Sequence, residues 1–126
     1  MTGRVFLIGI CGLLGVFSRY YFGILAFKMY PSPFPYGTFL INILGSFLIG
    51  VVYVAGIERS LLSEDLRVAI SVGFLGGFTT FSAYSLETVS LLGESKYFLA
   101  VMFWGLSPVL GAVAAFCGIQ VVRSLF

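Results

Sequence analysis

The sequence predicts an all-α integral membrane protein with four transmembrane helices. Of its 126 residues, 60% are hydrophobic and only 10% are charged, which no ordinary soluble domain matches. Four apolar stretches reach the roughly 20 residues that a helix needs to cross a bilayer, namely 5–27, 36–57, 66–92 and 97–122. Because the connections between them are short, we expect residues 1–126 to form a single four-helix membrane domain.

The first span, residues 5–27, combines a glycine face with one cation. Gly9, Gly12 and Gly15 recur every three residues, a spacing that lets a neighbouring helix approach closely in lipid. Arg19 lies late in the span, and two compatible interpretations apply to it. It is an anchor that extends to the membrane interface, or a fixed charge that raises the anion concentration at the mouth of a pathway.

The second span, residues 36–57, carries a polar stripe. Thr38, Asn42 and Ser46 are four residues apart and therefore share one face of a helix. The preceding segment, residues 30–36, contains three prolines, which exclude a helix through its centre. Two interpretations of Asn42 remain open. It joins two helices by hydrogen bonds, or its amide donates to an anion that passes through the protein.

The third span, residues 66–92, is predicted to break in the middle of the membrane. Its centre reads GFLGGFTTFSAYS from residue 73, where glycines weaken the helix and hydroxyls offer hydrogen bonds that lipid cannot use. Unwinding there would free backbone carbonyls such as those of Gly76 and Thr79, whose oxygens suit a small hard cation. The alternative is a glycine kink that packs against a neighbouring helix.

Three side chains follow the predicted break at intervals of three residues: Phe81, Tyr84 and Glu87. Aromatic rings have electropositive edges that can face an anion, although rings at helical spacing also fit ordinary packing. A carboxylate within a span is a candidate functional group. Glu87 is either a proton carrier or an organiser that is hydrogen-bonded to serine or threonine hydroxyls.

The fourth span, residues 97–122, has a close-packing face of small residues that begins at Ser107. Pro108 follows, and because proline lacks an N–H, one carbonyl in the preceding turn loses its usual donor. The Ser107 hydroxyl is available to point into a pore.

The charged residues constrain topology, and the missing residue types argue against catalysis. Four cations lie on the side of the termini, whereas the other side has Lys28 and Lys96, or three cations if Arg19 is included. So small a bias permits insertion in both orientations, and hence an antiparallel homodimer, but a single fixed orientation fits the counts equally well. The chain has no histidine and no evident nucleophile–base pair, so we expect no enzymatic activity.

Three motifs together resemble the Fluc (CrcB) family of bacterial fluoride channels over essentially the whole chain. They are GxxGxxxRY at residues 12–20, GTxxxNxxGS at residues 37–46 and GFxGGxTTFS at residues 73–82. The resemblance implies passive fluoride efflux through two pores of an antiparallel, dual-topology homodimer in the bacterial plasma (inner) membrane. The implied partners are fluoride, the lipid bilayer and a second copy of the chain, and no nucleic acid.

The resemblance also implies residues that line the pore. Asn42 matches the family's pore asparagine, Phe81 and Tyr84 match two pore aromatics, and Ser107 matches a pore serine. Two positions depart from the family pattern. Tyr84 stands where phenylalanine is usual, so its hydroxyl becomes a possible fluoride donor, and Phe103 stands where a tyrosine is often found.

Other residues are assigned to the ends and edges of the pore. Thr80 and Ser82 are candidate hydroxyl donors to fluoride, and Arg19 matches the arginine of the family's vestibule. The backbone carbonyls of Gly76 and Thr79 match the ligands of a structural sodium ion (Na⁺) at the dimer interface.

Two other function classes compete with a channel. A proton-coupled small multidrug-type exporter would use Glu87 for coupling, but it has little use for the glycine–threonine break. A structural subunit of a membrane complex would explain the glycines, but it leaves Asn42, Glu87 and the hydroxyl cluster without a role.

Overall fold

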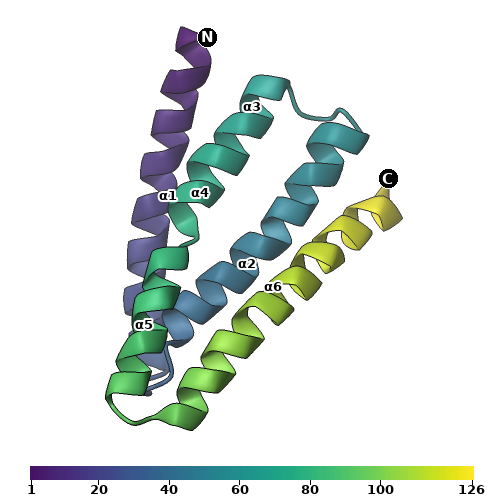
Figure 1. The fold of residues 1–126 in the computed structure, drawn as a ribbon. Helices are drawn as coiled ribbons and strands as arrows, with labels where there is room; N and C mark the ends of the chain where they lie inside the picture. Colours follow the sequence, from purple (N-terminus) through teal and green to yellow (C-terminus); the bar gives the residue numbers. More distant parts are fainter.

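The computed structural model describes residues 1–126, which form four long helical rods without any strand (Figure 1). The elements are α1 (Thr2–Met29), α2 (Tyr36–Tyr53), a π-helical turn (Val54–Glu58), α3 (Glu64–Val68), a π-helical segment (Ala69–Leu75), α4 (Gly76–Phe78), α5 (Phe81–Gly93) and α6 (Tyr97–Leu125). Four stretches are long and apolar enough to cross a membrane: Thr2–Met29, Tyr36–Glu58, Glu64–Gly93 and Tyr97–Leu125. The prediction of an all-α fold with four helices long and apolar enough to cross a membrane is therefore confirmed.

The four rods pack in two pairs that are joined along the third span. α1 lies against the segment Ala69–Leu75 and α4, whereas α2 lies chiefly against α6 and α5 against the first half of α6. Both chain termini lie at the same end of the molecule (Figure 1). The loops before α2 and before α6 lie at the opposite end, as an even number of crossings requires.

Glycines allow α2 and α6 to touch backbone to backbone. A Cβ atom at Gly118 would lie 2.1 Å from the Phe47 carbonyl oxygen, and one at Gly50 would lie 2.2 Å from the Ala115 carbonyl oxygen. No larger residue fits at either position without moving a helix. The predicted close-packing face of the fourth span is confirmed here, and its partner is α2.

The glycine face of α1 is used only in part. A Cβ at Gly15 would lie 2.1 Å from the Phe74 carbonyl oxygen, so α1 meets the third span there by direct backbone contact. Gly9 has open space around it. Of the three predicted glycines, Gly12 and Gly15 therefore face the third span, whereas Gly9 does not.

Ion pairs connect the rods at the end that carries the termini. Arg4 Nε donates to Asp65 Oδ1 at 2.5 Å, which joins α1 to α3. Arg123 Nε donates to Glu58 Oε2 at 2.9 Å, which joins α6 to the π-helical turn that follows α2. Ser63 accepts from the backbone N–H three residues later and caps α3, as the run of a serine and two acids predicts.

The loop before α2 is anchored by one aromatic side chain. The Phe34 ring lies 5.4 Å from the Phe39 ring and 5.6 Å from the Phe103 ring, both centroid to centroid and edge-on. Phe103 is completely buried and forms an apolar core cluster with Leu91 and Ala100. The loop therefore holds the ends of α2, α5 and α6 together.

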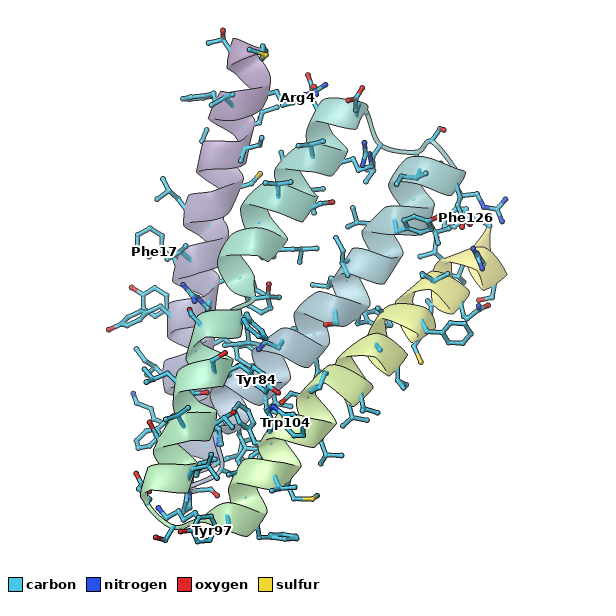
Figure 2. All side chains as sticks on the ribbon, in the orientation of Figure 1. Arg4, Phe17, Tyr84, Tyr97, Trp104 and Phe126 are labelled. Carbon is cyan, nitrogen blue, oxygen red and sulfur yellow. The ribbon has the colours of Figure 1, made fainter.

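Most large apolar side chains point outward. Only 18 of 126 residues are buried, and Phe6 and Phe98 expose 70% and 75% of their surface. Figure 2 shows Phe17 and Tyr97 projecting away from the rods. A surface of this kind requires lipid or other apolar protein to cover it.

Candidate functional site

The third span is interrupted by two residues with extended backbone. Thr79 has φ −84° and ψ 159°, and Thr80 has φ −152° and ψ 118°, so α4 ends at Phe78 and a new helix follows. The Thr79 hydroxyl donates to the Leu75 carbonyl at 2.8 Å. The Thr80 hydroxyl accepts from the Ala83 N–H at 3.2 Å and caps α5. The Thr79 hydroxyl therefore satisfies a carbonyl at the end of the first helical part, and the Thr80 hydroxyl satisfies an N–H at the start of α5.

Asn42 replaces the missing helical partners of Thr80. Asn42 Nδ2 donates to the Thr80 carbonyl at 3.0 Å, and the Thr80 N–H donates to Asn42 Oδ1 at 2.8 Å. In a continuous helix the Thr80 N–H would instead donate to the Gly76 carbonyl. The structure thus bears out the interpretation of Asn42 as a link between two helices, and it leaves the Gly76 carbonyl without its helical donor.

A groove of about 340 Å³ lies beside this interruption. We call it the interruption groove, and ten residues from α2 and the third span line it. Five of the nine predicted site residues are among them: Asn42, Gly76, Thr79, Thr80 and Phe81. Ser46 and Ser71 also line the groove. Phe81 exposes 79% of its surface. The groove brings an amide, an exposed ring and the interrupted backbone into one place.

The Tyr84 hydroxyl forms a hydrogen bond within the chain. Its O–H donates to the Trp104 carbonyl at 2.6 Å, and both side chains lie where α5 meets α6 (Figure 2). Four residues after Trp104 stands Pro108, which has no N–H to offer that carbonyl. Tyr84 therefore supplies the donor that the proline removes. Pro108 in the sequence predicts the unpaired carbonyl, but it does not indicate which side chain pairs with it.

The two predicted serines lie outside the interruption groove. Ser107 is buried, and its hydroxyl donates to the Phe103 carbonyl one turn earlier at 2.6 Å. Ser82 is exposed at the start of α5, and its hydroxyl oxygen lies 3.3 Å from that of Thr80.

The aromatic rings near the interruption lie close together. The Tyr84 ring is 5.2 Å from the Phe103 ring and 5.6 Å from the Phe81 ring, centroid to centroid.

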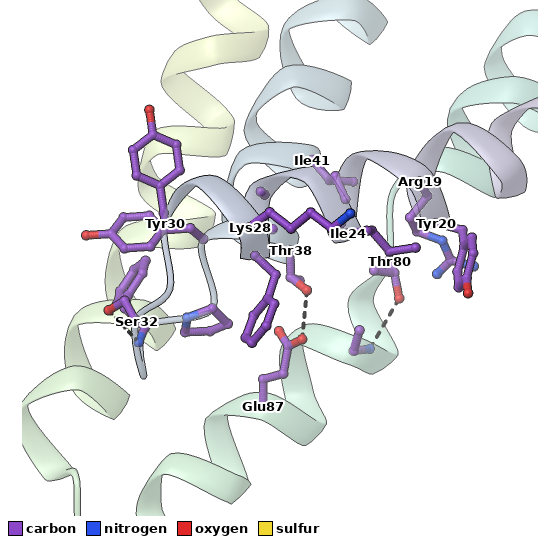
Figure 3. Close-up of a pocket in the computed structure, with 18 of the residues that line it drawn as sticks. Arg19, Tyr20, Ile24, Lys28, Tyr30, Ser32, Thr38, Ile41, Thr80 and Glu87 are labelled. Atoms are coloured by element: carbon purple, nitrogen blue, oxygen red, sulfur yellow. Dashed lines mark hydrogen bonds between the residues drawn. The ribbon is translucent and has the colours of Figure 1, made fainter.

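A second and larger pocket has a volume of about 840 Å³, and Thr80 is also among the residues that line it. We call it the large pocket; α1, the loop before α2, α2 and α5 line it, and its polar side chains include Arg19, Lys28, Thr38 and Glu87 (Figure 3). Thr80 is the one residue that lines both hollows.

The carboxylate of the large pocket is held in place by α2. The Thr38 hydroxyl donates to Glu87 Oε1 at 2.8 Å (Figure 3). Glu87 Oε2 is buried and has no hydrogen-bond partner. This bond to a threonine hydroxyl is the one expected if Glu87 organises the neighbouring helices by hydrogen bonding. Sequence reasoning missed Lys28 as a pocket residue, because its place at the end of the first span indicated only an interfacial cation.

Comparison with known proteins identifies the family. The CrcB-like protein family, Camphor Resistance (CrcB), matches residues 6–119 of the chain. A protein of Trichormus variabilis named fluoride-specific ion channel FluC is 41% identical over 88% of this chain and 82% of its own length. A protein of Geotalea daltonii with the same name is 40% identical over 94% of this chain and 96% of its own length.

These matches agree with the four membrane-spanning helices and with the predicted resemblance. A protein of Geobacter sulfurreducens, again named fluoride-specific ion channel FluC, is 37% identical over 94% of this chain and 95% of its own length. The chain is a multi-pass membrane protein, and it belongs to the CrcB-like family.

Proposed function

We propose that this protein is a passive, fluoride-selective ion channel that lowers the cytoplasmic fluoride concentration. The observation that carries the proposal is the pairing of Asn42 with the interrupted backbone at Thr80, beside the exposed ring of Phe81. Membership in a family whose relatives are named fluoride-specific channels supports the same function. In this proposal the protein conducts ions passively and catalyses no reaction.

Fluoride selectivity requires that the protein replace the water that the ion loses. Fluoride is small and strongly hydrated, so a narrow path must present donors at fixed positions. The Asn42 amide group has two N–H donors, and one of them is bonded to Thr80. The second N–H is the primary donor to fluoride in this proposal. Asn42 then holds the pore open and contacts the ion with the same side chain.

Aromatic edges complete the coordination in the proposed path. The electropositive ring edge of Phe81 contacts fluoride without the strong binding that a full cation would bring. Tyr84 contributes its ring, because its hydroxyl is bonded to the Trp104 carbonyl. Thr80, Ser82 and Ser107 provide further hydroxyls, and Ser107 reaches fluoride only after its hydroxyl turns away from the Phe103 carbonyl.

The interruption is proposed to lie at the middle of the membrane and to hold a sodium ion. Thr79 and Thr80 fall at the centre of the stretch Glu64–Gly93, which is 30 residues long. The Gly76 carbonyl lacks its helical donor, and the Thr79 carbonyl belongs to extended backbone. Oxygen ligands of this type suit a small hard cation, which would fix the interrupted backbone when bound.

Two copies of the chain are proposed to assemble as an antiparallel homodimer of dual topology in the bacterial inner membrane. Three features support this assembly: the weak bias of cations between the two ends, the large exposed apolar surface, and the open groove beside Gly76 and Thr79. The large pocket then forms the vestibule through which fluoride reaches the interruption, and Arg19 attracts the anion into it.

The test is fluoride efflux from liposomes that contain only the purified protein. Fast, passive release of fluoride with retention of chloride is the expected result. The variant Glu87→Gln serves as a second arm, because its side-chain carbonyl still accepts from Thr38 but cannot carry a proton. It should conduct like the wild type. Proton-driven transport that Glu87→Gln abolishes would favour an exporter instead, and folded protein without any transport would favour a structural subunit.

A further inference from the structure

The two cations of the large pocket, Arg19 and Lys28, form no ion pair. Of seven Lys and Arg residues, three form ion pairs: Arg4, Lys96 and Arg123. Arg19 and Lys28 have no carboxylate within 4.0 Å, and both line the large pocket. Their charges are therefore not neutralised by a direct partner, in a hollow that Thr80 of the interruption also lines.

Lys28 is directed into the pocket by the geometry of α1. It lies in the last turn of that helix, and side chains on a helix lean toward its N-terminus. Figure 3 shows the Lys28 side chain extended along α1, with its ammonium group on the side that leads to Arg19 and Thr80. Nine residues separate Lys28 from Arg19, which places their Cα atoms about 13 Å apart along the helix axis.

The single acid of the large pocket does not neutralise both cations. Glu87 is the only acidic residue among those that line it, and its Oε1 accepts from the Thr38 hydroxyl. The pocket therefore holds two cations and at most one negative charge. A net positive charge in a hollow with low-dielectric walls raises the local concentration of anions.

We infer that Lys28 is a second capture charge for anions, which acts with Arg19 to draw fluoride into the large pocket. The inference rests on the proposed function, and it concerns the rate of ion entry and not coordination at the interruption. At about 8 Å in water, one unit charge changes the local concentration of a monovalent anion by about two-fold. Such an effect is large at low ionic strength and is lost when salt screens the charge.

A simpler role for Lys28 must be separated from this one. A cation in the last turn of a helix interacts favourably with the helix dipole, and a lysine near a membrane interface anchors its helix. Either role would change folding or the number of active channels, and would leave the conductance of each open channel unchanged at every fluoride concentration. A capture charge lowers conduction only where ion entry is limiting.

The experiment measures single-channel conductance against fluoride concentration in planar bilayers, at low ionic strength and with an impermeant salt at about 1 M, where the screening length is about 3 Å. Lys28→Gln should lower conductance about two- to three-fold at low fluoride and low ionic strength. Its conductance should equal that of the wild type at saturating fluoride and in high salt. Lys28→Arg should behave as the wild type.

Lys96→Gln is the matched control, because Lys96 precedes α6 at the same end of the molecule but pairs with Glu94 and does not line the large pocket. It should conduct as the wild type under all conditions. Equal conductance of Lys28→Gln and wild type at low ionic strength would overturn the inference. So would a loss that persists at saturating fluoride, or an equal loss in Lys96→Gln. A silent wild-type protein would instead overturn the proposed function.

Discussion

The Asn42 side chain and the Thr80 backbone form a closed pair of hydrogen bonds, 3.0 Å from Asn42 Nδ2 to the Thr80 carbonyl and 2.8 Å from the Thr80 N–H to Asn42 Oδ1. The side-chain amide of Asn42 thus supplies the hydrogen-bond donor and acceptor that neighbouring turns of a continuous helix would supply to Thr80. The interruption of the third span is consequently tied to α2. One residue both satisfies the extended backbone and keeps a free N–H donor beside the groove.

Replacement of Asn42 by leucine should destabilise the fold and abolish fluoride conduction. The change leaves the Thr80 N–H and carbonyl without partners, at about 1–3 kcal/mol for each unsatisfied group. Thermal unfolding in detergent and fluoride efflux from liposomes measure the two effects. Gln120→Leu is the control, because Gln120 is the only other side-chain amide and lies exposed on α6. A variant Asn42→Leu with the stability and flux of wild type would contradict the assignment.

Phe81 should be needed for conduction but not for stability. Its ring is 79% exposed, so Phe81→Leu removes little buried surface and should change the free energy of unfolding by less than about 0.5 kcal/mol. The variant should nevertheless lose most of its fluoride flux, because leucine has no electropositive ring edge. Phe98→Leu, at a position 75% exposed on α6, should keep full flux. Equal flux in both variants would remove Phe81 from the proposed path.

The hydroxyl of Tyr84 should stabilise the protein only because Pro108 is present. Tyr84→Phe leaves the Trp104 carbonyl without a donor and should cost about 1–2 kcal/mol. In a Pro108→Ala background the new N–H can donate to the same carbonyl, so the same change should cost clearly less. A double-mutant cycle on thermal unfolding measures this coupling. Additive effects would show that the two residues do not share the Trp104 carbonyl.

Close contact between α2 and α6 should make Gly118 intolerant of any side chain. A Cβ there would lie 2.1 Å from the Phe47 carbonyl oxygen, so Gly118→Ala should separate the helices and destabilise the protein by about 1–3 kcal/mol. Gly105→Ala on the same helix meets no atom within 4 Å and should be neutral or slightly stabilising. Thermal unfolding of both variants tests this, and equal transitions would argue against the observed helix contact.

Sodium should stabilise the protein if the carbonyls of Gly76 and Thr79 bind it. Backbone ligands cannot be deleted by a side-chain substitution, so ion replacement is the suitable test. Unfolding temperature and fluoride efflux should both fall when sodium is exchanged for N-methylglucamine at constant ionic strength, because a ligand that binds only the folded state stabilises it. Identical unfolding in the two salts would speak against the cation site.

The sequence predicts the spans well, because long apolar runs and their length requirement are local properties. It also marks Asn42, the interruption and the carbonyl orphaned by Pro108 as unusual. Their partners are not local. Which donor reaches the Trp104 carbonyl depends on how α5 lies against α6, and the partner of Asn42 depends on the register between α2 and the third span.

Other features depend on packing that no single span encodes. The π-helical segment Ala69–Leu75 lies where α1 crosses the third span, and a Cβ at Gly73 within it would lie 2.6 Å from the Ile8 carbonyl oxygen. A glycine-rich run indicates a close contact, but the same run fits an α-helix equally well. Lys28 was missed as a pocket residue for a similar reason, because the pocket forms only when α1, α2 and α5 come together.

The most direct test of the account is the reversal potential of currents through the purified protein in a planar bilayer, with potassium fluoride on one side and potassium chloride on the other. A passive channel that selects fluoride by replacing its hydration shell should give single-channel currents that reverse far toward the fluoride equilibrium potential. Currents that reverse near zero, or that follow chloride, would contradict fluoride selectivity. Absence of current from folded protein would contradict conduction itself.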